Sequence, residues 1–165
     1  MSHKIIDNYL SKEDFQKLKA AIIHPSLPWY YHNQVVIDSN PKSEEDGNIF
    51  FCHPVYDMIP YSTIYDLIYE IIIKKINPKA IRRIKINLYP RTENIIHHKQ
   101  HVDYPFSHKN IILYLNTCNG FTVLEDGTKI ESIENRALFF DSSTKHHSTT
   151  CTDKKIRLNI NVNYF

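Results

Sequence analysis

Two residues two positions apart, His101 and Asp103, are the part of the sequence whose types and spacing most clearly suggest chemistry. On a β-strand, residues i and i+2 point to the same side of the sheet, so both side chains can bind one metal ion. Two imidazoles and a carboxylate on one face of an octahedron form the facial site of non-haem Fe(II) oxygenases, whose opposite face stays open. The pattern therefore predicts a third ligand further along the chain, and His146 and His147 are the two candidates.

Neighbouring residues of a strand face opposite ways, so only one of His146 and His147 can complete such a site. Two other histidines, His97 and His98, come shortly before His101 and could be interpreted as extra ligands. A position on the surface or in the wall of a pocket is the simpler interpretation, and we expect it for His97 and His98.

A polar stripe runs along the last predicted strand, residues 156–164, where Arg157 and three asparagines alternate with apolar residues. One face of this strand is therefore apolar and the other polar. The polar face either meets water, as in an ordinary half-exposed strand, or lines a cavity with Arg157 directed at an anion. A guanidinium is always charged and can donate two parallel hydrogen bonds to a carboxylate, which suits it to the second role.

The elements that would position these residues change in type along the chain. In the first half, apolar residues at helical spacing predict one helix that begins after Ser11 and ends before Pro25, and another over residues 62–76. Short strands are expected over 3–10 and 29–37. Residues 38–47 form a polar loop, which is either a lid or a solvated excursion.

From residue 80 onward the pattern has a period of two. It predicts strands over 81–89, 110–116, 121–125, 129–133, 136–141 and 156–164, with a hairpin turn at Asp126 and Gly127. Five or more strands after two helices predict a mainly β fold, a sandwich or barrel with flanking helices.

Length and composition limit the class of protein. A chain of 165 residues is the size of one domain, and its net charge of +2 disfavours a dedicated nucleic-acid binder. No apolar run approaches the roughly 18 residues of a membrane span, and Asp7 interrupts the N-terminal apolar stretch before a signal-peptide core could form. We therefore expect a cytoplasmic, intracellular protein that needs no membrane. Its three widely spaced cysteines predict reduced structural thiols.

The order His-x-Asp, a long β-rich stretch, a histidine and then Arg157 resembles the 2-oxoglutarate- and Fe(II)-dependent dioxygenases, most closely their prolyl-4-hydroxylase-like branch. Leu88-Tyr89-Pro90 is similar to the Tyr-Pro strand that precedes the His-x-Asp strand in that family. Leu113-Tyr114-Leu115-Asn116 and Asn119-Gly120-Phe121-Thr122 are similar to the Tyr-Leu-Asn segment and the Gly-Gly-x-Thr turn. The resemblance is good over residues 80–165 and weak over 25–78.

This resemblance implies a double-stranded β-helix (jelly roll) in a single domain, residues 1–165, with its core over 80–165 and supporting helices and strands over 1–79. It implies Fe(II) bound by His101, Asp103 and His146, because His146 fits the family spacing better than His147. The 2-oxoglutarate would chelate the iron, with its distal carboxylate bound by Arg157 and Tyr114 and with Tyr89 reaching the metal end.

The implied activity is hydroxylation of a prolyl residue, an amino acid or another small-molecule or peptide substrate. O2 is consumed, succinate and CO2 are released, and ascorbate can assist. Asp103 favours hydroxylation, since the halogenating relatives lack this carboxylate. The nucleic-acid dealkylase branch generally has a second arginine where this chain has Asn163, so repair of alkylated bases is disfavoured.

Two alternatives from other classes remain. The first is a cupin-like jelly-roll module that binds a metal or ligand without oxidising it, although such a module has no need of Arg157 on an asparagine-lined face. The second is a structural or interaction protein, which would bind no stoichiometric iron.

Overall fold

The structure is a computed structural model that describes residues 2–33 and 49–165. The helical elements are α1 (Lys12–Ile23), α2 (Ile64–Ile68), η2 (Tyr69–Ile73) and α3 (Lys74–Ile76). The strands are β1 (His3–Ile6), β2 (Tyr30–His32), β3 (Phe50–Asp57), β4 (Ile59–Pro60), β5 (Ile81–Pro90), β6 (Lys109–Tyr114), β7 (Phe121–Leu124), β8 (Lys129–Glu131), β9 (Ala137–Asp141), β10 (His146–Ser148) and β11 (Ile156–Tyr164). The expected loop over 38–47 and the end of the expected strand over 29–37 lie outside the described residues.

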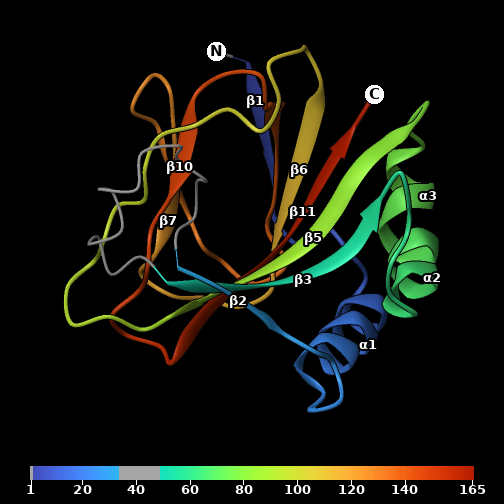
Figure 1. The fold of residues 1–165 in the computed structure, drawn as a ribbon, viewed down its shortest axis with the longest axis horizontal. Helices are drawn as coiled ribbons and strands as arrows, with labels where there is room; N and C mark the ends of the chain where they lie inside the picture. Colours follow the sequence, from blue (N-terminus) through green and yellow to red (C-terminus); the bar gives the residue numbers. More distant parts are fainter. Residues whose placement is uncertain (1, 34–48) are drawn as a thin grey trace.

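The strands form two antiparallel sheets. The major sheet has the order β1-β9-β6-β11-β5-β3-β2, with β4 paired to β3, and the minor sheet has the order β10-β7-β8. Figure 1 shows the helices on one side of the major sheet and β7 and β10 on the other. The expectation of a mainly β jelly roll with flanking helices is confirmed. Strands β1, β2 and β3, from the region expected only to support the core, are part of the major sheet.

The last strand, β11, lies inside the major sheet between β5 and β6. Its apolar residues, such as Ile160 and Val162, pack in the core cluster shared with the helices. Its polar stripe points the other way and is buried, since Arg157, Asn159, Asn161 and Asn163 are 0–6% exposed. The stripe therefore lines the interior of the jelly roll, and the solvent-exposed alternative is excluded.

The helices form where their apolar spacing predicts. Helix α1 begins after Ser11, whose hydroxyl accepts a hydrogen bond from the Asp14 backbone N–H, and buries Phe15, Leu18 and Ile22. Ile23, expected on the same face, is 57% exposed. The second predicted helix is one continuous segment, α2-η2-α3, with a π-helical middle. No helix of the described residues is long and apolar enough to span a membrane.

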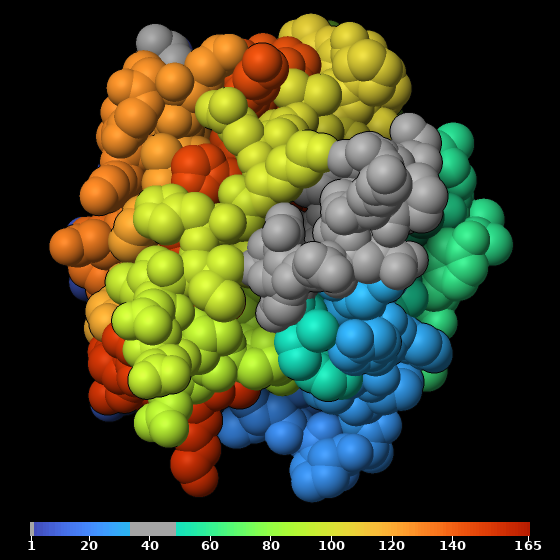
Figure 2. All heavy atoms as spheres, turned by 60° about the vertical axis from the view of Figure 1, so that its left-hand side comes forward, coloured from blue at the N-terminus to red at the C-terminus, as the bar shows by residue number. Residues whose placement is uncertain are grey.

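The six strands predicted after residue 80 are confirmed, each with its ends within a few residues. Gly127, with φ of +84°, turns the chain between β7 and β8, and the Gly127 N–H donates to the Leu124 carbonyl. Strands β3 and β4 were not predicted, and β10 was expected only as an unbounded strand that carries His146 and His147. Figure 2 shows the yellow-green segment that joins β5 to β6 lying across one face of the molecule, beside the orange atoms of β7 and β8.

Candidate active site

The side chains of His101, Asp103 and His146 come together although they lie far apart in sequence. One ligand atom from each lies within 4.8 Å of the other two. The backbones of His101 and His146 exchange two N–H···O hydrogen bonds of 2.9 Å, which places their imidazole centroids 4.7 Å apart. This backbone bridge between the β5–β6 connection and β10 brings the two predicted histidines to one metal-sized site.

Both imidazoles are oriented by backbone carbonyls. His101 Nδ1 lies 3.1 Å from the Lys99 carbonyl and His146 Nδ1 lies 3.0 Å from the Thr144 carbonyl. A carbonyl can only accept, so Nδ1 carries the proton and Nε2 keeps its lone pair for a metal. Burial, followed by His146, lowers the pKa of His101 to about 4, and burial also lowers the pKa of His146. Both are therefore neutral at pH 7, the form that binds metal.

Asp103 is fixed by four donors. Arg83 Nη2 lies 3.0 Å from Oδ1, while Ser142, Asn110 and Asn163 donate to Oδ2 over 2.7, 3.1 and 2.8 Å. Burial by itself would raise the pKa of Asp103, but Lys85 and Arg83 hold this pKa well below its usual range. Asp103 is therefore a carboxylate, the form that a divalent cation requires.

His147 lies outside this group. Its Nε2 lies 3.1 Å from His97 Nδ1, and His97 is exposed. His98 is 3% exposed, stacks on the Tyr89 ring at 5.0 Å and pairs through Nδ1 with the Ser148 hydroxyl at 2.7 Å. The structure therefore brings His146, and not His147, to the pair His101 and Asp103.

Arg157 lies at the other end of the interior and is fully buried. Its Nη2 donates to Thr122 Oγ1 at 3.0 Å and its Nη1 to the Thr149 carbonyl at 3.2 Å. The rings of Tyr89 and Tyr114 lie 5.4 and 5.6 Å from its guanidinium carbon. The three residues predicted for the co-substrate are thus adjacent.

Thr122 was missed as a site residue. Its hydroxyl receives hydrogen bonds from both Arg157 and Tyr114, the latter at 2.8 Å, and it lines the same cavity as His101. The sequence did contain a signal, because Thr122 ends the turn that resembles the Gly-Gly-x-Thr turn.

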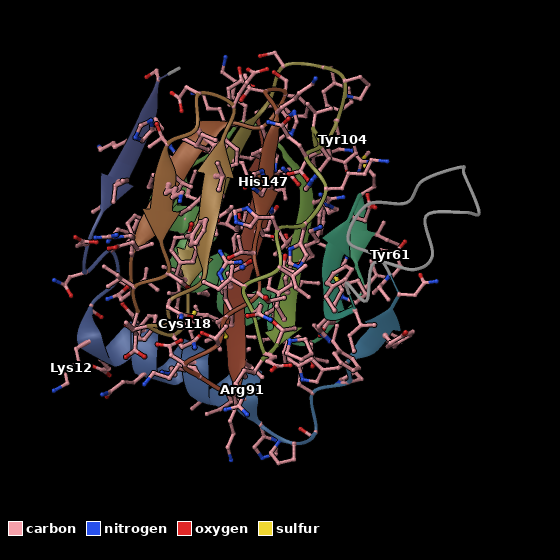
Figure 3. The ribbon with its side chains drawn as sticks, turned by 90° about the vertical axis from the view of Figure 1, so that its left-hand side faces the viewer. Lys12, Tyr61, Arg91, Tyr104, Cys118 and His147 are labelled. Carbon is pink, nitrogen blue, oxygen red and sulfur yellow. The ribbon has the colours of Figure 1, made fainter. Side chains whose placement is uncertain are left out.

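The strand register sets the order of residues along the interior. Arg157 is opposite Tyr89, and the next three rungs pair Asn159 with Asn87, Asn161 with Lys85, and Asn163 with Arg83. In the last of these pairs, the side chains of Asn163 and Arg83 both donate hydrogen bonds to Asp103. Figure 3 shows the two ends: Tyr104, which follows Asp103, lies near one end of the barrel, and Cys118 and Arg91 lie near the other.

Several buried polar atoms along this interior have no partner among the described residues. They include the Nε atoms of Arg157 and Arg83, His98 Nε2, and the side-chain oxygens of Asn87, Asn110, Asn161 and Asn163. Buried polar groups are nearly always hydrogen-bonded, so these atoms indicate a site for a polar ligand. The free space beside the histidines is about 30 Å³, which is about one water molecule, so a larger ligand requires side chains to move. The donor set fits a divalent metal, and Arg157 fits a carboxylate.

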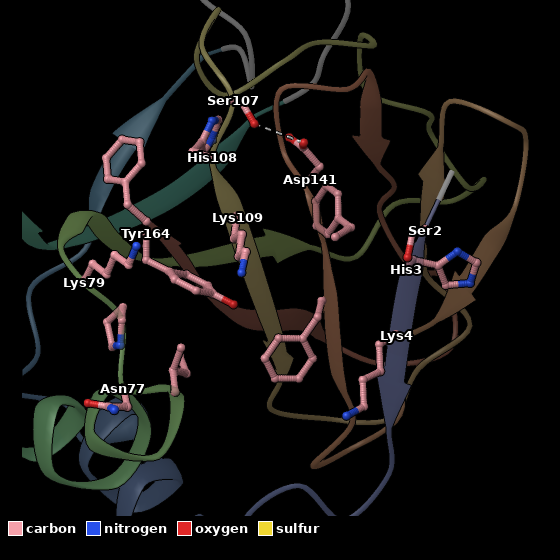
Figure 4. Close-up of a pocket in the computed structure, with 15 residues that line it drawn as sticks. Ser2, His3, Lys4, Asn77, Lys79, Ser107, His108, Lys109, Asp141 and Tyr164 are labelled. Carbon is pink, nitrogen blue, oxygen red and sulfur yellow. Dashed lines mark hydrogen bonds between the residues drawn. The ribbon is translucent and has the colours of Figure 1, made fainter.

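A larger groove of about 780 Å³ lies elsewhere, beside β1 and α3. Figure 4 shows Lys4, Lys79 and Lys109 around it, with Tyr164 between them and Ser107 bonded to Asp141. None of the residues of the His101 group lines this groove. The chemistry predicted from the sequence therefore belongs to the smaller interior cavity.

Cys118 and Cys151, which were expected to be isolated structural thiols, lie together beside Asp153. The sulfur atoms and a carboxylate oxygen are within 4.8 Å of one another. Burial, and then Cys118, raises the pKa of the Cys151 thiol to about 11, and both cysteines are free and buried. A protonated thiol is a poor metal ligand and a poor nucleophile, so Cys151 is structural at neutral pH.

No protein-family model matches the sequence, and no curated protein sequence matches it. Solved structures do match. A prolyl hydroxylase from Trichoplax adhaerens, in complex with a hypoxia inducible factor oxygen degradation domain peptide fragment, aligns with a TM-score of 0.67 and 14% identity over 99% of this chain and 83% of that one. A 2OG-Fe(II) oxygenase family oxidoreductase from Burkholderia pseudomallei aligns at 0.66 and 14%, over 98% and 84%.

A viral collagen prolyl hydroxylase from Paramecium Bursaria Chlorella virus-1, in complex with 2-oxoglutarate, aligns with a TM-score of 0.61 and 15% identity over 100% of this chain and 97% of that one. At identities this low, the structural alignments establish the fold only. The chemistry has to be argued from the residues of this chain. The chain has the jelly-roll fold of the 2-oxoglutarate- and Fe(II)-dependent oxygenases, as the sequence resemblance implied.

Proposed function

We propose that the protein is a 2-oxoglutarate- and Fe(II)-dependent dioxygenase that hydroxylates a peptide or small-molecule substrate. One observation carries this proposal: a His-Asp-His group and a buried arginine without a carboxylate partner lie at opposite ends of one polar interior. When bound, Fe(II) and 2-oxoglutarate supply the oxidation, in which O2 is consumed, succinate and CO2 are released and a C–H bond becomes C–OH.

His101, Asp103 and His146 are the proposed metal ligands. The two neutral imidazoles present Nε2 because their Nδ1 protons are held by carbonyls. Asp103 supplies the negative charge, and the three donors on Oδ2 leave Oδ1 for the metal once Arg83 gives way. Three protein ligands on one face leave positions for co-substrate and O2.

Arg157 is the proposed partner of the distal carboxylate of 2-oxoglutarate. A fully buried guanidinium with an unpaired Nε is costly unless an anion reaches it, and its present partners are a hydroxyl and a carbonyl. Tyr114 and Thr122 can donate to the same carboxylate, and Tyr89 closes the wall behind it. These side chains bind and orient the diacid and exclude water from it.

The substrate class rests on the comparisons and on the site. The Trichoplax protein is described with a peptide and the viral protein as a collagen prolyl hydroxylase, which supports a prolyl or related substrate. Asn163 at the place of a second arginine argues against nucleic acid. We further propose a reducing, intracellular location, in keeping with three free cysteines.

The test is turnover without a guessed substrate. Purified protein with Fe(II), ascorbate, O2 and 2-oxoglutarate should release succinate slowly, and Asp103→Ala should abolish this signal. Asp66→Ala, which removes an exposed carboxylate on α2, is the matched control and should keep it. Protein that binds both Fe(II) and 2-oxoglutarate but releases no succinate, alone or with candidate prolyl peptides, would instead be the cupin-like binding module. Protein that binds neither would overturn the proposal outright.

A further inference from the structure

Lys85 is a cation inside the cavity that the proposed function has not used. It lies on β5 and lines the same small space as His101, Asp103 and His146. Most of its surface is buried, and it makes no hydrogen bond or ion pair in the part of the chain that the structure describes. Burying a charged amine without an anion beside it costs free energy, so we expect an anion to bind next to Lys85.

The surroundings of Lys85 do not provide a free anion among the described residues. Asn161 faces it from β11, Cys52 and His32 approach from β3 and β2, and Arg83 is the next inward-facing residue on β5. Asp103 is the nearby carboxylate, but it already has four donors and is a proposed metal ligand. Burial and then Arg83 lower the pKa of Lys85, while Asp103 and Cys52 raise it, so an added carboxylate beside the amine would favour its charged form.

The register places Lys85 and Arg157 at two different levels of one interior. Arg157 is opposite Tyr89 and Lys85 is opposite Asn161, four residues further along β11, which is about 13 Å of strand. Lys85 lines the same cavity as Tyr89 and Thr122, which both contact Arg157, so the two cations border one continuous interior. A diacid with its distal carboxylate on Arg157 would therefore extend toward Lys85 and the His101 group.

We propose that Lys85 binds the carboxylate next to the oxo group of the 2-oxo acid, so that the co-substrate is held between two cations. This inference rests on the proposed function. Arg83 is the other nearby cation, but it lies opposite Asn163, which places it further along the strand from Arg157 than Lys85. Lys85 makes no hydrogen bond or ion pair among the described residues, and it is a positioning residue for the metal end of the co-substrate.

The two cations can be separated by choice of ligand. 2-Oxopentanoate keeps the oxo group and its neighbouring carboxylate but lacks the distal carboxylate. Anaerobic calorimetry on the Fe(II)-loaded protein should show that Lys85→Met weakens both 2-oxoglutarate and 2-oxopentanoate by about tenfold or more. Arg157→Met should weaken 2-oxoglutarate alone. Lys85→Arg should stay within about threefold of the wild type, since the charge is kept.

Lys79→Met, which removes a lysine of the outer groove, is the control and should leave both affinities unchanged. Thermal unfolding of each variant checks that it is folded. Unchanged binding of both acids by folded Lys85→Met, or weaker binding of 2-oxoglutarate alone, would overturn the inference while leaving the proposed function intact. Failure of the wild-type protein to bind Fe(II) or 2-oxoglutarate would overturn both.

Discussion

Arg83 Nη2 lies 3.0 Å from Asp103 Oδ1, the same carboxylate oxygen that lies 3.9 Å from His101 Nε2. The guanidinium therefore occupies one side of the oxygen that a metal shared with His101 would use. Three other donors hold Oδ2, so Asp103 keeps its orientation without Arg83. Arg83 thus both stabilises the charged form of Asp103 and competes with a metal for it.

Removing this competition should strengthen metal binding. Arg83→Met deletes a positive charge beside a site for a divalent cation, and the repulsion it relieves outweighs one lost hydrogen bond. We expect the affinity for Fe(II) to rise by about tenfold, or about 1.4 kcal/mol. Anaerobic titration at pH 7 measures it.

Arg82→Met is the matched control, because the neighbouring Arg82 pairs with Asp57 and not with Asp103. Its Fe(II) affinity should equal that of the wild type. A lower affinity in Arg83→Met would mean that Arg83 orients Asp103 rather than competing for it.

The two adjacent histidines of β10 should differ sharply in their effect on metal binding. His146→Ala removes one of three converging side chains, and two remaining ligands seldom hold a divalent ion tightly. His147→Ala removes only the contact with His97. We expect Fe(II) binding to be lost in the first variant and kept within about threefold in the second. Equal affinities in the two variants would contradict the assignment.

Gly120 should be indispensable for the position of Arg157. A Cβ atom at residue 120 would lie 2.6 Å from Arg157 Cδ and 2.6 Å from the Thr150 carbonyl oxygen. The carbonyl is backbone and cannot swing away, so Gly120→Ala should cost about 1–3 kcal/mol of unfolding free energy. Because Arg157 must shift, 2-oxoglutarate affinity should fall at the same time.

Gly127→Ala separates the two effects. Nothing lies within 4 Å of a Cβ at residue 127, but its φ of +84° is unfavourable for alanine. This variant should lose about 1 kcal/mol of stability through backbone strain and bind 2-oxoglutarate normally. Urea unfolding and calorimetry on both variants make the comparison, and normal 2-oxoglutarate binding by folded Gly120→Ala would show that Arg157 is not held there by packing.

The sequence predicted most of the fold because two local patterns correspond directly to the folded elements. These are the alternation of polar and apolar residues in strands and the helical spacing of apolar residues in helices. Strand β3 was not predicted from the sequence because Pro54 interrupts it, and its register with β5 shifts just after that residue. The bounds of β10, the strand expected to carry His146 and His147, were not predicted because it is three residues long and lies in a polar run. Both strands depend on partners far along the chain, which local patterns do not contain.

The site shows a different limit. Alternation along β11 identified the polar stripe, but the same pattern describes a strand facing water and a strand facing a cavity. Only the opposing minor sheet decides between them. Lys85 and Asn87 form a similar polar stripe on β5, yet nothing local distinguishes an inward lysine from the many outward ones. Residue types were therefore enough to predict the metal ligands. The polar residues that line the interior between these ligands and Arg157 could be identified only from the folded structure.

Acid should destabilise the metal-free protein through its buried neutral histidines. Burial, and then Arg157, lowers the pKa of His98 to about 3, whereas an unfolded chain protonates histidine near pH 6.5. Between these values the unfolded state binds more protons, so the free energy of unfolding falls as the pH falls, by up to about 1.4 kcal/mol per pH unit. His101, with a pKa of about 4, adds to this slope in the same direction.

His98→Asn removes one of these groups while keeping a side chain that can pair with Ser148. Between pH 7 and pH 5 the variant should lose about 2 kcal/mol less stability than the wild type, whatever its stability at pH 7. Urea unfolding in EDTA at several pH values measures this difference. His24→Asn is the control for the substitution itself, because exposed His24 also pairs through Nδ1 with a serine, Ser26. If His98→Asn and the wild type lose stability in parallel, His98 is protonated in the folded protein and does not act as a buried neutral imidazole beside Arg157.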